Sequence, residues 1–393
     1  MPAAASVISS IDRPVWLEDV LMAKVALVSN SAWNLFNFRR PVIEALLARG
    51  DEVIAIAPED GHGKNLTGLG CLFVDTKIDP QGFSVASDIG SLVNLKRIYT
   101  VHKPAVVLHF TIKPVIYGTL AARFSGIPAI NTITGLGTAF IREGFLTKIV
   151  ELLYRLALPG PRPVIFQNLD DLSLFRQKHL VTNNPCHVVP GSGIDLQEFP
   201  ASPLPDGNSV NFLLIARLLR DKGIFEYVEA ARQIRQSNPR VRFQILGPTG
   251  VANRTAIEKS QIEAWVRDGV IDYLGETDDV RPYIANADCV VLPSYREGMP
   301  RTLLEAAAMG RPLIATDVTG CRDVVDDGVN GYLCAPREAG DLALKIRDFI
   351  DLISAERQKM GTASREKAES QFDVKRVVDT YLDLIDAQIA GRD

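Results

Sequence analysis

Two glutamates, Glu297 and Glu305, lie eight positions apart, in a segment where an apolar run gives way to a helical pattern. The run 288–293 predicts a short buried strand. Pro300 suits the first turn of a helix because it lacks an N–H group, and Gly310 suits its end. The segment therefore predicts a strand, a loop and a helix whose free N–H groups can receive a phosphate. Carboxylates at such a site are better matched to the hydroxyls of a ribose or a sugar.

Two cations follow another predicted strand. Arg217 comes directly after the apolar run 212–216, and Lys222 lies five positions further on, just before Gly223. A guanidinium engages two phosphate oxygens at once, and an ammonium adds a compact charge. The pair therefore predicts a diphosphate site, in which both cations stabilise the charge that grows on a leaving group. Solvated surface cations are the alternative interpretation.

These patterns together resemble those of the retaining glycosyltransferases of family 4. The two glutamates match the family's E-x7-E motif, and the two cations match its R-x4-K diphosphate clamp. Residues 191–195 match its Gly-(Val/Ile)-Asp turn at the domain junction, and residues 320–331 match its glycine-bounded tail motif. Because all four occur in the family's order, the match is far more specific than E-x7-E alone.

The resemblance extends from residue 24 to residue 385. Residues 110–114, 131–137 and 298–305 are similar to segments of enzymes that extend polyprenyl-diphosphate-linked sugars. The resemblance implies the two-domain GT-B fold, with the last helix crossing back to the first domain. It also implies a retaining hexosyl or N-acetylhexosaminyl transfer from a UDP-sugar to a saccharide on undecaprenyl diphosphate. We expect no cofactor.

The resemblance also implies roles for the residues of the second half. Arg217, Lys222 and Glu297 form the catalytic set, with Glu297 on the transferred sugar. In donor binding, Glu305 accepts hydrogen bonds from the ribose hydroxyls, and further contacts come from Gly298, Met299, Thr302, Tyr273 and Gly275. Tyr273 and Gly275 follow a predicted strand where the family contacts the base, although an ordinary strand end is an equal alternative.

The first half is expected to hold the acceptor. Where many family members have a Gly-Gly pair after the first strand, this chain has Ser29, Asn30 and Ser31, which we expect to approach phosphate less tightly. A predicted helix from residue 41 to residue 49 places two cations at its start, where they oppose the helix dipole unless an anion joins them. The candidate acceptor ligands are Asn37, Arg39, Arg40, His109, Lys113, Thr134 and Gly135.

Each of these acceptor assignments has an alternative. Arg39, Arg40 and Lys113 could equally be solvated cations, and His109, which closes an apolar run, could be a satisfied core residue. Thr134 stands where many relatives have a histidine, and it cannot act as a general base near neutral pH. Retention without an obvious nucleophile implies departure and attack on the same face of the sugar.

The order of the predicted elements indicates an α/β protein with two doubly wound, Rossmann-like domains facing across a cleft. Short apolar runs, mostly without alternation, predict parallel strands at 24–29, 52–57, 71–75, 105–110, 129–134, 164–167, 187–189, 212–216, 242–247, 271–274, 289–293, 312–316 and 332–334. Three prolines at 200–209 indicate a linker. The predicted division is an extension at 1–21, an acceptor domain at 22–199, the linker, a nucleotide-sugar domain at 210–372 and a returning helix at 373–393.

Composition excludes several classes of protein. The chain has 393 residues and a formal net charge of −4, which does not favour nucleic acid as a partner. It contains no Asp-x-Asp and no histidine spacing typical of metal ligands, so we expect no metal. Five cysteines without a Cys-x-x-Cys motif, and no signal-peptide pattern at the N-terminus, indicate reduced thiols in the cytoplasm.

Residues 140–162 are strongly apolar, with arginines and a lysine scattered among them. The segment is too short to span a bilayer but could lie in the interface, where its cations meet anionic headgroups; a buried helix is the alternative. We therefore expect a protein peripheral to the cytoplasmic face of the membrane. Three other functions stay open: transfer to a soluble acceptor, a nucleotide-sugar epimerase on the same fold, and a non-catalytic sugar-binding module.

Overall fold

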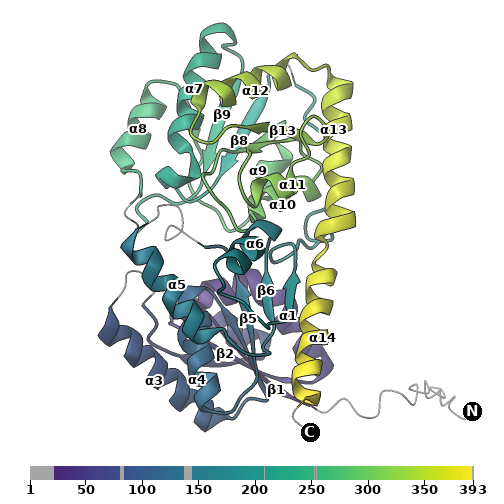
Figure 1. The fold of residues 1–393 in the computed structure, drawn as a ribbon. Helices are drawn as coiled ribbons and strands as arrows, with labels where there is room; N and C mark the ends of the chain where they lie inside the picture. Colours follow the sequence, from purple (N-terminus) through teal and green to yellow (C-terminus); the bar gives the residue numbers. More distant parts are fainter. Residues whose placement is uncertain are drawn as a thin grey trace, which may run out of the picture.

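The chain forms two parallel β-sheets, one in each half (Figure 1). The computed structural model describes residues 22–79, 84–136, 144–207, 209–251, 253 and 255–391, so the predicted extension at 1–21 lies outside the described part. Helices flank each sheet. The residues that line a cleft come from both halves. The predicted class, two doubly wound Rossmann-like domains, is confirmed.

The first sheet has the strand order β3-β2-β1-β4-β5-β6-β7, with every pairing parallel. The central strands β4 and β5 are buried at every residue, as expected of strands covered on both faces. The bounds are β1 (Lys24–Val28), β2 (Glu52–Ala57), β3 (Leu72–Asp75), β4 (Val106–Phe110), β5 (Ala129–Ile133), β6 (Val164–Phe166) and β7 (Cys186–Val188).

The second sheet has the order β10-β9-β8-β11-β12-β13 and is also parallel throughout. Its strand order reverses between β8 and β11, and open α/β sheets bind ligands at such a point. Arg217 follows β8 and Glu297 follows β11, so both predicted motifs leave the sheet there. The bounds are β8 (Asn211–Ile215), β9 (Arg242–Leu246), β10 (Asp272–Tyr273), β11 (Cys289–Leu292), β12 (Leu313–Thr316) and β13 (Gly331–Cys334).

Helices connect these strands in both halves. The first half contains α1 (Ala32–Arg49), α2 (Gly63–Leu69), α3 (Val85–His102), the π-helix η2 (Pro114–Gly118), α4 (Thr119–Phe124), α5 (Phe145–Ala157) and α6 (Leu169–Gln177). The rest of the chain contains the 3-10 turn η4 (Arg220–Lys222), α7 (Ile224–Ser237), α8 (Lys259–Arg267), α9 (Arg281–Ala285), α10 (Arg301–Ala308), α11 (Cys321–Val324), α12 (Ala339–Asp351), α13 (Ser354–Lys367), the π-helix η5 (Ala368–Phe372) and α14 (Val374–Ala390).

The predicted start of the first helix at residue 41 is wrong, because α1 begins at Ala32 and runs through Pro41. Ser31 caps it by accepting a hydrogen bond from the N–H of Asn34 at 3.1 Å. A proline inside a helix cannot donate to the carbonyl four residues before it, here that of Asn37. That carbonyl instead accepts a hydrogen bond from Nη1 of Arg301, in the second half, at 2.7 Å.

The last helix, α14, lies against the first half (Figure 1). Val377, Leu384 and Ile385 join the core formed by β1, β4 and α1. The hydroxyl of Tyr381 lies 2.8 Å from that of Thr132 on β5. The chain thus returns to the first half after completing the second sheet.

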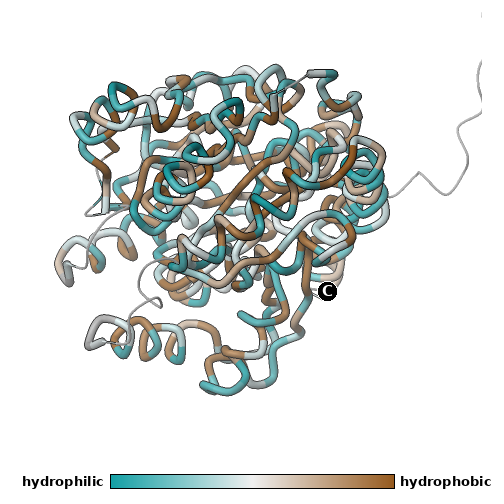
Figure 2. Tube along the Cα trace, turned by 90° about the horizontal axis from the view of Figure 1, so that it is seen from above, coloured by the Kyte–Doolittle hydropathy of each residue, from teal (hydrophilic) through white to brown (hydrophobic). Residues whose placement is uncertain are grey.

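Hydrophobic residues concentrate in the interior of the molecule, where the strands run (Figure 2). In the second half the rings of Phe212 and Phe243 stack at 5.4 Å within the core. The sheets are therefore packed scaffolds, and the loops at their carboxyl ends carry the side chains that face the cleft.

Candidate active site

A cleft of ≈ 450 Å³ lies between the carboxyl ends of the two sheets. It brings together three predicted residues of the first half, Lys113, Thr134 and Gly135. From the second half it brings together Arg217, Lys222, Glu297 and Gly298. The other predicted site residues do not line this cleft.

Lys222 and Glu297 form an ion pair on the second half's side of the cleft. Nζ of Lys222 lies 2.5 Å from Oε1 of Glu297, which also accepts a hydrogen bond from the Ser294 hydroxyl at 2.6 Å. Gly223 makes this approach possible, because its φ is +73° and a Cβ there would lie 2.0 Å from the carbonyl oxygen of Pro293. The side chains of Lys222 and Glu297 keep 22% and 13% exposure, so both remain open to a ligand in the cleft.

Glu305 lies on α10 and does not line the cleft. It is 8% exposed and accepts a hydrogen bond from Nε of Arg301 at 2.8 Å. Burial raises the pKa of this carboxyl group, and the guanidinium of Arg301 partly opposes that rise. Pro300 precedes the helix and does not begin it, because Arg301 is its first residue.

The remaining donor candidates are engaged within the second half. The hydroxyl of Thr302 donates to the carbonyl of Ile215 at 3.2 Å, so its proton is not free for a phosphate. The Tyr273 hydroxyl donates to the carbonyl of Gly247 at 2.9 Å, and the N–H of Gly247 donates to the carbonyl of Gly275 at 2.8 Å. Met299 packs against the core of the second half.

Two acceptor candidates, His109 and Arg39, lie inside the first half. The His109 ring is fully buried between the Tyr99 hydroxyl and Oδ1 of Asn131, each at 2.9 Å. Burial lowers the pKa of His109 to about 4, although the hydrogen bond to Asn131 opposes this, so the ring is neutral at pH 7. Arg39 is 2% exposed, and its guanidinium lies 4.4 Å from the centre of the Phe110 ring. Both are corrected from cleft ligands to core residues.

The remaining acceptor cations have partners too. Arg40 is exposed and pairs with Glu44 on the same helix at 2.7 Å. It lines, with Asn37, a separate cavity of ≈ 360 Å³ beside Arg301. Lys113 lines the main cleft, and its Nζ is buried 2.8 Å from Oδ1 of Asp88.

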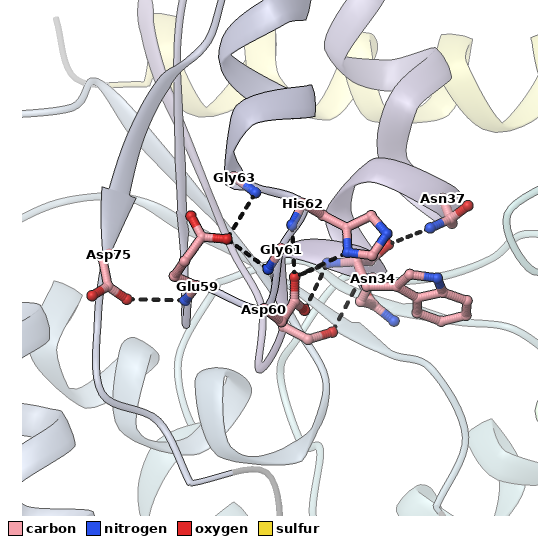
Figure 3. Close-up of polar contacts among 10 residues, drawn as sticks. Asn34, Asn37, Glu59, Asp60, Gly61, His62, Gly63 and Asp75 are labelled. Carbon is pink, nitrogen blue, oxygen red and sulfur yellow. Dashed lines mark hydrogen bonds and ion pairs between the residues drawn. The ribbon is translucent and has the colours of Figure 1, made fainter. Parts of the chain in front are cut away.

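The start of α1 is held by internal groups (Figure 3). Asp60 accepts a hydrogen bond from the N–H of Trp33 at 2.9 Å, and Oε1 of Glu59 accepts one from the N–H of Gly61 at 2.7 Å. Ser31 caps the helix, and Ser29 is fully buried. Of the three small residues expected to approach phosphate, only Asn30 lines the cleft.

Two protein-family models match the chain. The model described as "Glycosyl transferase 4-like" matches residues 24–168, and the model described as "Glycosyl transferases group 1" matches residues 209–351. The two models fall on the two halves that form the cleft. The chain belongs to the family 4 glycosyltransferases.

Named relatives of this glycosyltransferase include two bacterial enzymes. The N,N'-diacetylbacillosaminyl-diphospho-undecaprenol alpha-1,3-N-acetylgalactosaminyltransferase of Campylobacter jejuni is 28% identical over 93% of this chain and 99% of its own length. The UDP-Gal:alpha-D-GlcNAc-diphosphoundecaprenol alpha-1,3-galactosyltransferase of Escherichia coli is 27% identical over 77% of this chain and 81% of its own.

Solved structures share the fold. Sucrose-phosphate synthase from Thermosynechococcus elongatus superposes with a TM-score of 0.79 at 19% identity, covering 94% of this chain and 100% of that one. An Anabaena protein in complex with UDP and glucose gives a TM-score of 0.75 at 18% identity, covering 93% and 100%. At these identities the likeness establishes the GT-B fold.

Several residues of the glycosyltransferase site were not predicted. Arg296 lines the cleft and pairs with Asp171, and Arg301 links Glu305 to the first half. Thr111 lines the cleft with a left-handed φ of 69°, a strained conformation for a β-branched residue. No sequence motif pairs Arg296 with a residue 125 positions earlier.

The site supplies cations that can balance a negatively charged ligand, and beside them the Glu297 carboxylate, which Lys222 and Ser294 hold by hydrogen bonds. Arg217 and Lys222 line this wall and can compensate a diphosphate, and α10 begins at Arg301, three residues after Gly298 of the same wall. Within the described residues, no group of three or more His, Cys, Asp or Glu side chains could hold a metal ion.

Proposed function

We propose that this glycosyltransferase moves a hexosyl or N-acetylhexosaminyl group from a UDP-sugar to a saccharide on undecaprenyl diphosphate, with retention and without a metal ion. The observation that carries the proposal is the ion pair of Lys222 with Glu297, beside Arg217, at the edge of the cleft. These groups match a nucleotide diphosphate and a sugar lying side by side. The names of both bacterial relatives support a lipid-diphosphate-linked acceptor.

In the proposed mechanism the bond between the anomeric carbon and the diphosphate oxygen breaks as the acceptor oxygen attacks from the same face. Arg217 and Lys222 balance the charge growing on the leaving phosphate. A phosphate oxygen takes the proton of the acceptor hydroxyl. Glu297, oriented by Lys222 and Ser294, contacts the transferred sugar. His109 takes no part, because it is buried, neutral and bonded at both nitrogens.

The direct test combines the protein with UDP-, GDP- and ADP-sugars, with EDTA present, and measures the thermal midpoint first. A bound donor raises it in proportion to RT ln(1 + [L]/Kd). The stabilising donor is then supplied with a polyprenyl-diphosphate-linked saccharide, and the product's anomeric configuration is read by NMR. We expect a retained linkage formed in EDTA. Conversion of the sugar without acceptor would favour an epimerase, and full activity on a free saccharide would favour a soluble acceptor.

The predicted membrane contact at 140–162 falls partly on α5, while residues 137–143 lie outside the described part of the chain. Helix α5 adjoins α4, since Nη2 of Arg123 donates to the carbonyl of Ala157 at 3.0 Å, and α4 adjoins α3 (Figure 1). We define the α3–α5 face by six apolar side chains of these helices that are 54% to 66% exposed: Ile89, Val93, Val101, Phe124, Leu152 and Leu156.

Charge on the α3–α5 face favours an anionic lipid surface. The exposed charged side chains of these three helices are all cationic: Lys96, Arg97, Arg123, Lys148 and Arg155. The two carboxylates are buried and paired, Asp88 with Lys113 at 2.8 Å and Glu151 with Lys178 at 2.6 Å. No helix among the described residues is long and apolar enough to cross a membrane. The contact that we propose is peripheral and lies on the cytoplasmic leaflet.

The variant Leu152→Glu/Leu156→Glu should bind vesicles of phosphatidylcholine and phosphatidylglycerol about tenfold more weakly or worse, because two leucines no longer enter the interface. Co-sedimentation measures the binding. Leu344→Glu is the matched control, a 49% exposed leucine on α12 in the second half. Equal binding by the double variant and the control would contradict the contact.

A further inference from the structure

The loop between β11 and α10, residues 293–300, contacts the first half as well as its own. Nδ2 of Asn168 donates to the carbonyl of Gly298 at 2.8 Å, and the guanidinium of Arg296 donates to Oδ1 of Asp171. A Cβ on Gly298 would lie 2.8 Å from the carbonyl oxygen of Thr134 and 2.9 Å from Oε1 of Gln167. The position of this loop is therefore set by the first half.

Asp171 is built into a rigid part of the first half. It lies in the first turn of α6, where its charge suits the helix dipole. Asn168 caps α6, and its Oδ1 accepts a hydrogen bond from the N–H of Asp171 at 2.7 Å while its Nδ2 donates to Oδ2 at 3.1 Å. One oxygen of the carboxylate thus has a partner from its own helix, and the other has Arg296 from the opposite half.

The burial of this pair distinguishes it from its neighbours at the same seam. The Asp171 side chain is 0% exposed and that of Arg296 is 22% exposed. The adjacent Asp170 accepts a hydrogen bond from the Thr319 hydroxyl at 2.9 Å, but this contact is exposed. Screening by water makes an exposed contact weak, whereas removing one partner of a buried pair is costly.

We propose that Asp171 and Arg296 form a latch that sets the loop of Glu297 and Gly298 in its catalytic position when the two halves meet. Both are positioning residues. The inference rests on the proposed function only in taking this loop to act in sugar transfer. Arg217, Lys222 and Glu305 all belong to the second half. The latch therefore controls turnover and leaves the affinity for the nucleotide almost unchanged.

The test is a double-mutant cycle with Asp171→Asn, Arg296→Gln and the double variant. We expect each single variant to lower kcat at least tenfold while the Kd for UDP, from calorimetry, changes less than threefold. The double variant should be no worse than the poorer single one, because both remove one interaction. Arg296→Lys, which keeps the charge without the planar fork, should fall between wild type and Arg296→Gln.

Asp170→Asn is the matched control, one residue away on the same turn and across the same seam; its kcat should stay within twofold of wild type. Additive losses in the double variant would overturn the latch, and so would a fall in UDP affinity that matches the fall in kcat.

Small-angle scattering with UDP bound gives a second readout that needs no transfer reaction. We expect a larger radius of gyration for Asp171→Asn than for wild type, and equal radii would overturn the latch. If wild type transfers no sugar, the proposed function fails and scattering still decides the latch.

Discussion

Replacement of Lys222 by alanine is expected to lower kcat by about 10²- to 10³-fold, the cost typical of removing one group aimed at charge that develops in the transition state. Its ammonium is the cation nearest Glu297, at 2.5 Å. Without it the diphosphate loses a counter-charge, and a mostly buried carboxylate faces the same anion without compensation. Transfer of a radiolabelled sugar from the donor measures the effect.

The fold should tolerate this change, because Lys222 lies on the cleft surface and outside the hydrophobic core. Arg220→Ala provides the matched control. Arg220 belongs to the same turn but is exposed, with its guanidinium 4.6 Å from the centre of the Phe225 ring, and it does not line the cleft. We expect the kcat of Arg220→Ala to stay within twofold of wild type. The thermal midpoint of unfolding should be unchanged in both Arg220→Ala and Lys222→Ala. Equal activity of Lys222→Ala and wild type would remove Lys222 from the mechanism.

The second large effect is expected for Gly298→Ala, with kcat reduced by about 10²-fold, because a misplacement of about 1 Å costs that much in a positioned site. The added methyl group would lie 2.8 Å from the carbonyl oxygen of Thr134, 2.9 Å from Oε1 of Gln167 and 3.1 Å from Cα of Gly135. Two of these neighbours are backbone atoms, so the halves must separate or the loop must shift. Steady-state kinetics with donor and acceptor varied separately would show the loss in kcat.

Gly340→Ala is the control for this substitution. Gly340 lies in the first turn of α12, and a Cβ there meets nothing within 4 Å. Alanine should leave kcat unchanged and stabilise the protein by about 0.4–1 kcal/mol, since it restricts the unfolded chain. A Gly298→Ala enzyme with the kcat of wild type would mean that the halves do not approach this closely during the reaction.

The fold could be read from the sequence because its strongest signals are local. The runs that became β4 and β5 are short, apolar and without alternation, and both are buried at every residue. The grouping of Arg217, Lys222 and Glu297 was equally accessible, because Arg217 and Lys222 lie five positions apart after β8 and Glu297 lies in the loop after β11. Strand ends in a parallel sheet then bring these two local motifs to the same edge.

The candidate residues of the first half were harder to read, because their contacts are distant in the sequence. Pro41 looked like a helix start, but α1 tolerates it in its interior. His109 and Arg39 looked available for a ligand, and both are buried by partners from other strands and helices. Arg296 had no visible role, because Asp171 lies on the other half of the molecule. Spacing along the chain carries no information about such pairs.

The proline inside α1 has a consequence for how the two halves recognise each other. Pro41 leaves the main-chain carbonyl of Asn37 without its usual amide donor. Arg301 of the second half, which also donates to Glu305, donates a hydrogen bond to that carbonyl. The carbonyl left unpaired within α1 thus accepts a hydrogen bond from a side chain of the opposite half. The carboxylate proposed to hold the ribose is thus linked to the first half through one guanidinium, at a contact separate from the pair of Asp171 and Arg296.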